Sequence, residues 1–432
     1  MGHAEIRVIA LGAGALALLL ASGCGRSGDN QSSGNPQGSR QDAAVSVSPA
    51  DGATQVAPEL PIMIGTVYGA LRSVEVRATS KNTPLEGVLS ADRTKWRSKR
   101  PMAPGETYRV TVVAVGRSGK TTQLTSQFST IKATQTFAAD KILPNKDITG
   151  LTVGVGMPIM LTFDKPIADR LSVERNLSVQ ASRPVEGAWH WIDEKSVVYR
   201  PKHWWPAHTK VKLVAQLGGV RGGPGMYGAG DYVREFEIGR SQISHADTAS
   251  HQMTVKRDGK VIRTVPLSAG NGDSWKHYTT NGIHLAMSRE DVTTMTSPDA
   301  GPGSAGYYQL TVYDTVRISD TGEYVHGAPW SVGSQGNSNV SHGCINVSPE
   351  NAKWFKEVTL IGDPIIVTGT PRQLDPGNGW GYWQESWPQW LRWSGMRSAS
   401  PTEALSAVPV SEHTTGSPAS EEHGKKGKTT TS

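Results

Sequence analysis

The chain has 432 residues, a formal net charge of +6 and an isoelectric point near 9.1. This length predicts two or three globular units, and 48 Gly and 26 Pro among many Val and Thr favour short strands and turns over long helices. The positive charge favours anionic surroundings such as acidic lipid or an anionic cell-wall polymer. No basic stripe interleaved with aromatic residues occurs in the body of the chain, which argues against a nucleic-acid partner.

Residues 1–24 have the features of an export signal. An apolar run from Val8 to Ala21, too short for a membrane span, follows Arg7. The small residues before Cys24 resemble a bacterial lipobox, in which the cysteine becomes lipid-modified; the alternative is an ordinary cleaved signal with an incidental cysteine. Both predict an extracytoplasmic protein facing the periplasm and cell wall, and lipidation would anchor it to the membrane. Residues 25–43 are rich in Gly, Ser and Gln and predict a flexible linker.

Two blocks of short β-like runs follow, at 44–134 and 135–240. The first includes 108–115, and the second includes 159–166, 187–191, 197–201 and 211–214. Repeated strands separated by turn residues predict a small β-sandwich in each block. Neither block has a cysteine, a cluster of metal ligands or a convincing catalytic pair, so both are interpreted as spacers or binding modules.

The third block, 241–372, is also predicted to be mainly β with one short helix. Asp258-Gly259 between two β-like runs predicts a hairpin. The run 308–318 alternates apolar and polar residues, and a turn at 320–323 returns the chain to a strand that carries His326. Ser348-Pro349-Glu350 predicts a helix start, and 365–367 a closing strand.

The C-terminal residues divide into two parts. Residues 373–397 hold five of the thirteen tryptophans, which we expect to dock this segment on the third block rather than to form an exposed glycan platform. Residues 398–432 are rich in Ser, Thr and Pro and are predicted to be a disordered tail.

Cys344 is the cysteine of the mature body and lies in Ser341-His342-Gly343-Cys344-Ile345-Asn346. Its polar flanks argue against a buried structural thiol and predict a nucleophile activated by an imidazole. His342 and His326 compete for the role of base; we favour His326, since such a base usually comes from a separate element, and assign His342 to support or substrate contact. Gly343 permits a sharp turn whose amides would face a developing oxyanion.

The pattern of His326-Gly327-Ala328-Pro329-Trp330, a gap of fourteen residues after His326 and then 341–346 closely resembles the L,D-transpeptidase catalytic domain. The resemblance covers 242–372. It extends to two immunoglobulin-like domains, the Trp-rich extension and the lipoprotein-type start, the layout of mycobacterial and related actinobacterial members.

The resemblance implies a cysteine acyltransferase that needs no cofactor. Cys344 would attack the third residue, meso-diaminopimelate, of a peptidoglycan tetrapeptide stem, release D-Ala, and pass the acyl group to a second stem as a 3→3 cross-link. His326 would be the base, oriented by the carbonyl of residue 327, which is Ser in close relatives and Gly here. Positions that match the family's substrate site are Tyr308, Trp330, Ser341, His342, Asn346 and Met295. Carbapenems would acylate the same cysteine.

Several alternatives stay open at this stage. His326, His342 and Cys344 are of residue types that suit zinc, although no accompanying zinc-site spacing occurs. The chain would otherwise be a non-catalytic wall-binding lipoprotein, or a hydrolase in which water is the acceptor. The segment 288–306 is either a lid over the pocket or a plain connecting loop.

Overall fold

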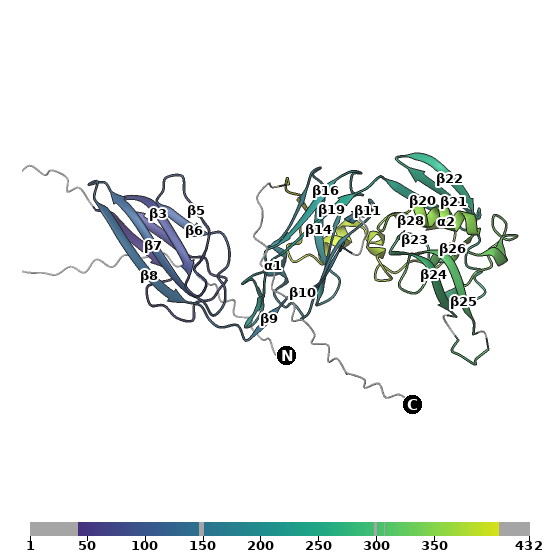
Figure 1. The fold of residues 1–432 in the computed structure, drawn as a ribbon, viewed down its shortest axis with the longest axis horizontal. Helices are drawn as coiled ribbons and strands as arrows, with labels where there is room; N and C mark the ends of the chain where they lie inside the picture. The colour runs from purple at the N-terminus through teal and green to yellow at the C-terminus, as the bar shows by residue number, and fades with distance from the viewer. Residues whose placement is uncertain (1–41, 147–150, 298–299, 306, 406–432) are drawn as a thin grey trace, which may run out of the picture.

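The computed structural model describes residues 42–146, 151–297, 300–305 and 307–405. The predicted signal, Cys24 and the linker up to residue 41 lie outside these ranges. Three β-rich domains follow one another along the molecule (Figure 1), so the expectation of a mainly β protein is confirmed. Within the described ranges, no helix has both the length and the apolar character needed to cross a bilayer.

The first domain is a sandwich of two four-stranded sheets, in the orders β1-β2-β6-β5 and β4-β3-β7-β8. Alternation along the long strand β7 buries Tyr108, Val110, Val112 and Ala114 between the sheets. The strands are β1 Ala44–Ser48, β2 Met63–Val67, β3 Gly69–Ala78, β4 Thr83–Pro84, β5 Gly87–Leu89, β6 Lys95–Ser98, β7 Thr107–Gly116 and β8 Thr121–Ser129.

The second domain has sheets in the orders β10-β12-β15-β14-β29, β11-β19-β16-β13 and β17-β18-β9. Its core is rich in aromatic residues, and both Trp189 and Trp191 of β14 are buried there. The elements are β9 Gln135–Phe137, β10 Ala139–Leu143, β11 Thr152–Val153, β12 Ile159–Phe163, α1 Arg170–Glu174, β13 Leu177–Ala181, β14 Glu186–Trp191, β15 Ser196–Pro201, β16 Lys210–Ala215, β17 Arg221–Gly223, β18 Met226–Gly228, β19 Tyr232–Ile238 and β29 Ser400–Pro401.

The Trp-rich segment corrects our expectation about where it docks. Trp390, in α3 Trp387–Arg392, is fully buried in the core of the second domain and donates from Nε1 to Ala188 O at 3.0 Å. The short 3₁₀ helix η4, Gly381–Gln384, contacts the third domain, where Gln384 Oε1 accepts from Ile283 N at 2.9 Å. The segment therefore docks on the third domain as expected and also on the second, because Trp390 is buried in the core of the second domain.

The predicted disordered tail also needs a correction. Residues 398–405 are described, and β29 pairs antiparallel with β14 through Ser400 and Pro401. Thr402 Oγ1 accepts from Val185 N at 3.0 Å. The start of this segment is thus ordered by main-chain pairing to an exposed sheet edge, a contact that composition does not reveal.

The third domain packs the sheet β22-β21-β20-β28-β23 against the sheet β24-β25-β26-β27. The hairpin at Asp258-Gly259 forms as predicted, with both residues at positive φ. The predicted strand 365–367 is β28, but it lies inside its sheet, between β20 and β23. The strands are β20 Gln242–Asp247, β21 Gln252–Arg257, β22 Lys260–Pro266, β23 Gly282–Leu285, β24 Ser288–Thr296, β25 Gln309–Arg317, β26 Tyr324–Gly327, β27 Ile345–Val347 and β28 Pro364–Thr368.

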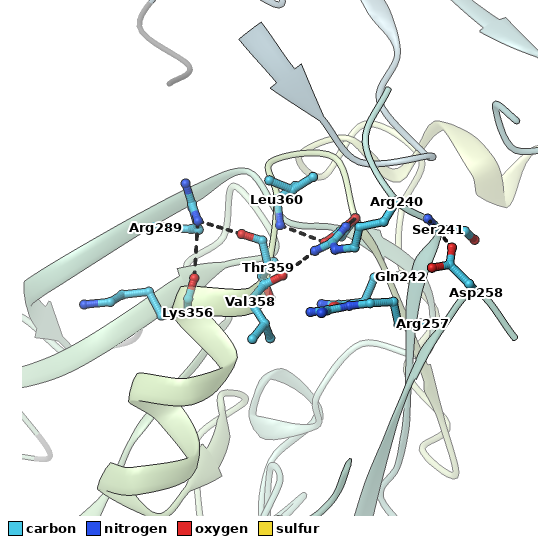
Figure 2. Close-up of polar contacts among 11 residues, drawn as sticks. Arg240, Ser241, Gln242, Arg257, Asp258, Arg289, Lys356, Val358, Thr359 and Leu360 are labelled. Carbon is cyan, nitrogen blue, oxygen red and sulfur yellow. Dashed lines mark hydrogen bonds and ion pairs between the residues drawn. The ribbon is translucent and has the colours of Figure 1, made fainter. Parts of the chain in front are cut away.

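Helix α2, Pro349–Val358, starts at the predicted cap, where Ser348 Oγ accepts from Asn351 N at 3.2 Å. Figure 2 shows two arginines at the other end of this helix. Arg289 donates to Thr359 O at 2.7 Å, and Arg240, from the link between the second and third domains, donates to Val358 O. Arg240 also binds both carboxylate oxygens of buried Asp363, at 2.8 and 2.6 Å. The link between these domains is therefore tied to the terminus of α2.

Candidate active site

Cys344 lies immediately before β27, in a loop whose shape depends on Gly343. Gly343 has φ of 130°, a conformation that favours glycine. Ser341 Oγ donates to Cys344 O at 2.6 Å, and Thr279 Oγ1 donates to Gly343 O at 2.8 Å. Side-chain hydrogen bonds from Ser341 and Thr279 therefore fix the loop that carries Cys344, and Cys344 is half-buried.

His326 lies on β26, the neighbour of β27. These strands are parallel, with His326 paired to Asn346. Cys344 comes directly before β27, and its sulfur lies beside the backbone of Tyr324, two residues before His326 on β26. His326 Nδ1 lies 3.0 Å from Gly327 O, which leaves Nε2 as the nitrogen able to take a proton. Burial lowers the pKa of His326, and the contact with Gly327 acts in the opposite direction.

The sulfur itself has main-chain partners. Cys344 Sγ donates to Gly322 O at 3.6 Å, and the N–H of Tyr324 points at the sulfur. Burial raises the pKa of the thiol to about 12, the Tyr324 amide acts to lower it, and the carboxylate of Glu323 raises it. Among the described residues, no hydrogen bond joins Cys344 to His326, and the sulfur is instead held by the turn before β26.

Aromatic side chains stand on both sides of these two residues. The ring of Tyr308 lies 5.4 Å from that of His342 in a tilted arrangement, and His277 meets His342 edge-on at 4.5 Å. Burial raises the pKa of Tyr308, and a negative charge on Cys344 acts in the same direction. Trp330 lies 6.1 Å from the ring of His326 and is 55% exposed. The resulting site has a histidine–tyrosine wall and an accessible tryptophan.

Two other predicted residues lie on strands of the third domain. Asn346, on β27, is buried and donates from Nδ2 to Ser331 Oγ at 3.2 Å. Met295, on β24, pairs with Leu310 of β25, two residues after Tyr308. The substrate contacts of both stay predictions.

The amide of Gly343, predicted as an oxyanion donor, already has a partner. Gly343 N donates to Ser341 Oγ at 3.2 Å. In this conformation the donor is engaged within its own loop. The oxyanion role of Gly343 stays a prediction, and it requires that this bond be given up.

Sequence reasoning missed the residues behind the thiol. Glu323, predicted only as part of a turn, is 4% exposed, and its carboxylate accepts from Thr280 N at 2.8 Å and from the Thr280 hydroxyl. The adjacent Thr279 holds the cysteine loop. The sequence does show an acid one residue before the strand that carries His326. Its role could not be predicted, because the Thr280 groups that bind its carboxylate lie 43 residues away in the chain.

Two alternatives can be compared with this geometry. Across the described ranges, no group of three His, Cys, Asp or Glu side chains is placed to hold a metal ion. The segment considered as a lid is partly regular structure, because 288–296 form β24, which pairs with β25 along its length. Only the connection after Thr296 remains as a loop, and residues 298, 299 and 306 lie outside the description.

Comparisons with known proteins agree with this architecture. A family profile described as the L,D-transpeptidase catalytic domain matches residues 241–367, and one described as a bacterial Ig domain matches 53–221. L,D-transpeptidase 5 of Mycobacterium tuberculosis is 37% identical over 81% of this chain and 76% of that protein. L,D-transpeptidase 2 of the same species is 35% identical over 80% of this chain and 83% of that protein. A solved LD transpeptidase in complex with imipenem is 36% identical and covers 54% of this chain and 99% of its own, with a TM-score of 0.46.

The third domain, with its paired sheets and cysteine loop, is thus of the L,D-transpeptidase catalytic type, preceded by an Ig-like region. The chain belongs to the L,D-transpeptidase family, whose function lies in peptidoglycan cross-linking.

Proposed function

We propose that this protein forms 3→3 cross-links through a thioester on Cys344. The thiol gives its proton to His326 Nε2, and the sulfur attacks the carbonyl carbon of the third residue of a tetrapeptide stem. The amide bond to D-Ala breaks, and D-Ala leaves with the proton from His326. The side-chain amine of meso-diaminopimelate on a second stem then displaces the sulfur, and the proton it loses returns to the thiol by way of His326.

The observation that supports this proposal is the pairing of β26 with β27, which brings the strand of His326 next to the strand that follows Cys344, together with the contact that holds His326 Nδ1 at Gly327 O. A histidine held through Nδ1 presents Nε2 as a base, the arrangement that cysteine acyl transfer requires. The resting thiol is bonded to Gly322 O instead. Rotation of the Cys344 side chain toward the base is therefore the first step that we propose.

The substrate groups are assigned by position. Tyr308 and His342 form the wall beside the sulfur and are proposed to contact the donor stem, while exposed Trp330 borders the base. Ser341 and Asn346 hold the loop and the strand beneath it. A carbapenem presents a strained acyl group to the same thiol, and we propose that it acylates Cys344.

The experiment is to incubate the purified protein with disaccharide-tetrapeptide and to identify the products by mass spectrometry. We expect a 3→3 linked dimer together with free D-Ala, and neither product from Cys344→Ala. A dimer formed by Cys344→Ala would contradict the proposal. Release of tripeptide without dimer would instead show that water is the acceptor.

We also propose that the protein acts outside the cytoplasm, tethered through lipid on Cys24. The support is the signal-like start and the residues before Cys24. Fractionation of cells expressing the full chain should find it in the membrane. Cys24→Ser should release it from the membrane, and an unchanged membrane fraction would contradict the lipid anchor.

A further inference from the structure

A buried acid lies directly behind the proposed nucleophile and has no role in the steps above. Glu323 is 4% exposed, and both of its carboxylate oxygens accept hydrogen bonds from Thr280, one from the backbone N–H at 2.8 Å and one from the hydroxyl. Its own N–H donates to Ser319 Oγ at 3.0 Å. The side chain is therefore fixed in one position inside the third domain.

A second buried ionisable group completes this cluster. His284 is fully buried, with Nδ1 3.1 Å from Ile318 O and Nε2 2.9 Å from Thr280 O. Thr280 Oγ1 lies 3.3 Å from Nε2 and donates its hydrogen to Glu323. The cluster is thus a chain of contacts from His284 through Thr280 to Glu323.

This chain is joined to the thiol through the backbone on either side of Glu323. The residue before it, Gly322, accepts the hydrogen of Cys344 Sγ, and the residue after it, Tyr324, donates its N–H to the same sulfur. The carboxylate also lies against the cysteine loop, since a Cβ built on Gly343 would be 3.8 Å from Glu323 Oε1. The hydrogen bonds that fix the Glu323 side chain consequently also fix Gly322 O and Tyr324 N–H, the two groups that contact the sulfur.

We propose that Glu323, bonded through Thr280 to His284, is a positioning residue that holds the backbone of 322–324 against Cys344 and sets by its charge the pH at which the thiol ionises. This inference rests on the proposed function, in which Cys344 is the nucleophile. It adds a residue that determines how reactive the free thiol is before a substrate or inhibitor arrives.

The negative charge of Glu323 acts in a known direction on the pKa of the Cys344 thiol. A negative charge next to a thiol disfavours the thiolate, and Glu323 raises the pKa of Cys344 after the larger effect of burial. The other titratable side chains around the thiol are His326, His342, Tyr308 and Tyr324. Among the described residues, this group contains no further carboxylate. Removal of the carboxylate charge should therefore make the thiol ionise at lower pH.

The test is the rate at which iodoacetamide alkylates Cys344 in the full chain, measured over a range of pH, with peptide mapping to separate Cys344 from Cys24. Glu323→Gln should displace the profile by about one pH unit, so that alkylation at a given pH is about tenfold faster. Glu323→Asp keeps the charge, and its profile should not move, although transpeptidation should fall several-fold as the shorter side chain releases the turn. The matched control is Glu350→Gln, an acid on α2 that is 88% exposed, which should change neither quantity.

Two results would overturn the inference. One is a Glu323→Gln profile that superimposes on that of the unmodified protein. The other is acceleration of the same size in Glu323→Asp, which would mean that loosened packing and not charge exposes the sulfur. Should Glu323→Gln fail to fold, Thr280→Val decides in its place, because it removes the hydroxyl that binds the carboxylate, and an alkylation profile that superimposes on that of the unmodified protein would contradict the inference. The alkylation readouts do not require transpeptidation, so they fail independently of the proposed function.

Discussion

Arg200 in the second domain and Glu323 in the third are both buried charged side chains, and their surroundings differ. In the second domain, Arg200 is 2% exposed and lies over the rings of Trp390 at 4.6 Å, Trp383 at 4.7 Å and Trp387 at 5.3 Å. Burial lowers the pKa of Arg200 to about 10, and Glu385 opposes that change. In the third domain, Glu323 is buried among hydrogen-bond donors one residue from the groups that touch a thiol.

The difference lies in what surrounds each charge. Aromatic faces attract the guanidinium without reacting, so Arg200 fastens the C-terminal segment to β15 and contributes to stability. Glu323 has a titratable neighbour, and its charge therefore changes chemistry as well as stability. A variant in the first region should alter unfolding alone, whereas a variant around the thiol should alter rates in a protein that stays folded.

The largest effect should come from the proposed base. His326→Ala removes the group that takes the thiol proton, and the acylation rate should fall by a factor of about 10² to 10⁴. The rate of carbapenem adduct formation on Cys344, followed by intact mass, measures this loss. Circular dichroism should show the fold retained, and acylation at the unmodified rate would exclude His326 as the base.

In the aromatic region, Trp390→Ala should lower the free energy of unfolding by about 4 kcal/mol, because it leaves a cavity in the core of the second domain. Trp393→Ala is the matched control, since that ring is 61% exposed and should cost little. Urea unfolding measures both. If the two variants were equally stable, the C-terminal segment would not be a structural part of the second domain.

At the link between the second and third domains, stability is expected to depend on pH through Asp363. Burial raises the pKa of Asp363 from 3.8 to about 6, while Arg240 acts to lower it. A carboxyl whose pKa is raised by folding is destabilising above that value, and the penalty disappears as the pH falls toward 3.8. Without Arg240, the pKa of Asp363 should rise further and the penalty should grow.

Arg240→Met should therefore lose about 3 kcal/mol of stability near neutral pH. The loss should be clearly smaller at about pH 5, where the carboxyl binds a proton. Urea unfolding at both pH values measures the difference between variant and parent. A loss that does not depend on pH would mean that Asp363 keeps its charge without Arg240.

The smallest effect should come from Gly327, the residue whose carbonyl holds His326. Gly327→Ser keeps that carbonyl, so the acylation rate should stay within about threefold of the parent rate. Its Cβ would approach Tyr313 O at 3.3 Å and Ala352 Cβ at 3.4 Å, so a small loss of stability should accompany the change. A rate loss as large as that of His326→Ala would indicate that the backbone, and not the carbonyl alone, is critical here.

Local signals predicted much of the fold. The hairpin at Asp258-Gly259 and the helix cap at Ser348 depend on residues a few positions apart, and both form as expected. The motif around Cys344 likewise identified the loop and its histidines, because spacing along the chain fixes that pattern. The structure adds the parallel pairing that brings the strand of His326 next to the strand that follows Cys344.

Long-range packing accounts for what sequence missed. The Trp-rich segment was expected on the third domain alone, but it also packs on the second domain, where Trp390 meets β14, 200 residues away. Glu323 looked like an ordinary turn residue, since its partner Thr280 lies 43 residues away in the chain. The amide of Gly343 was expected to face an oxyanion, and in the structure it donates to the hydroxyl of Ser341.

The central claim is that Cys344 carries the acyl group. Rapid quenching of the protein with disaccharide-tetrapeptide, followed by peptide mapping, tests it most directly. We predict that the Cys344 peptide gains the mass of the stem without its terminal D-Ala, and that the adduct disappears when an acceptor stem is added. Cross-linked product that accumulates while the Cys344 peptide stays unmodified at every time would contradict the account.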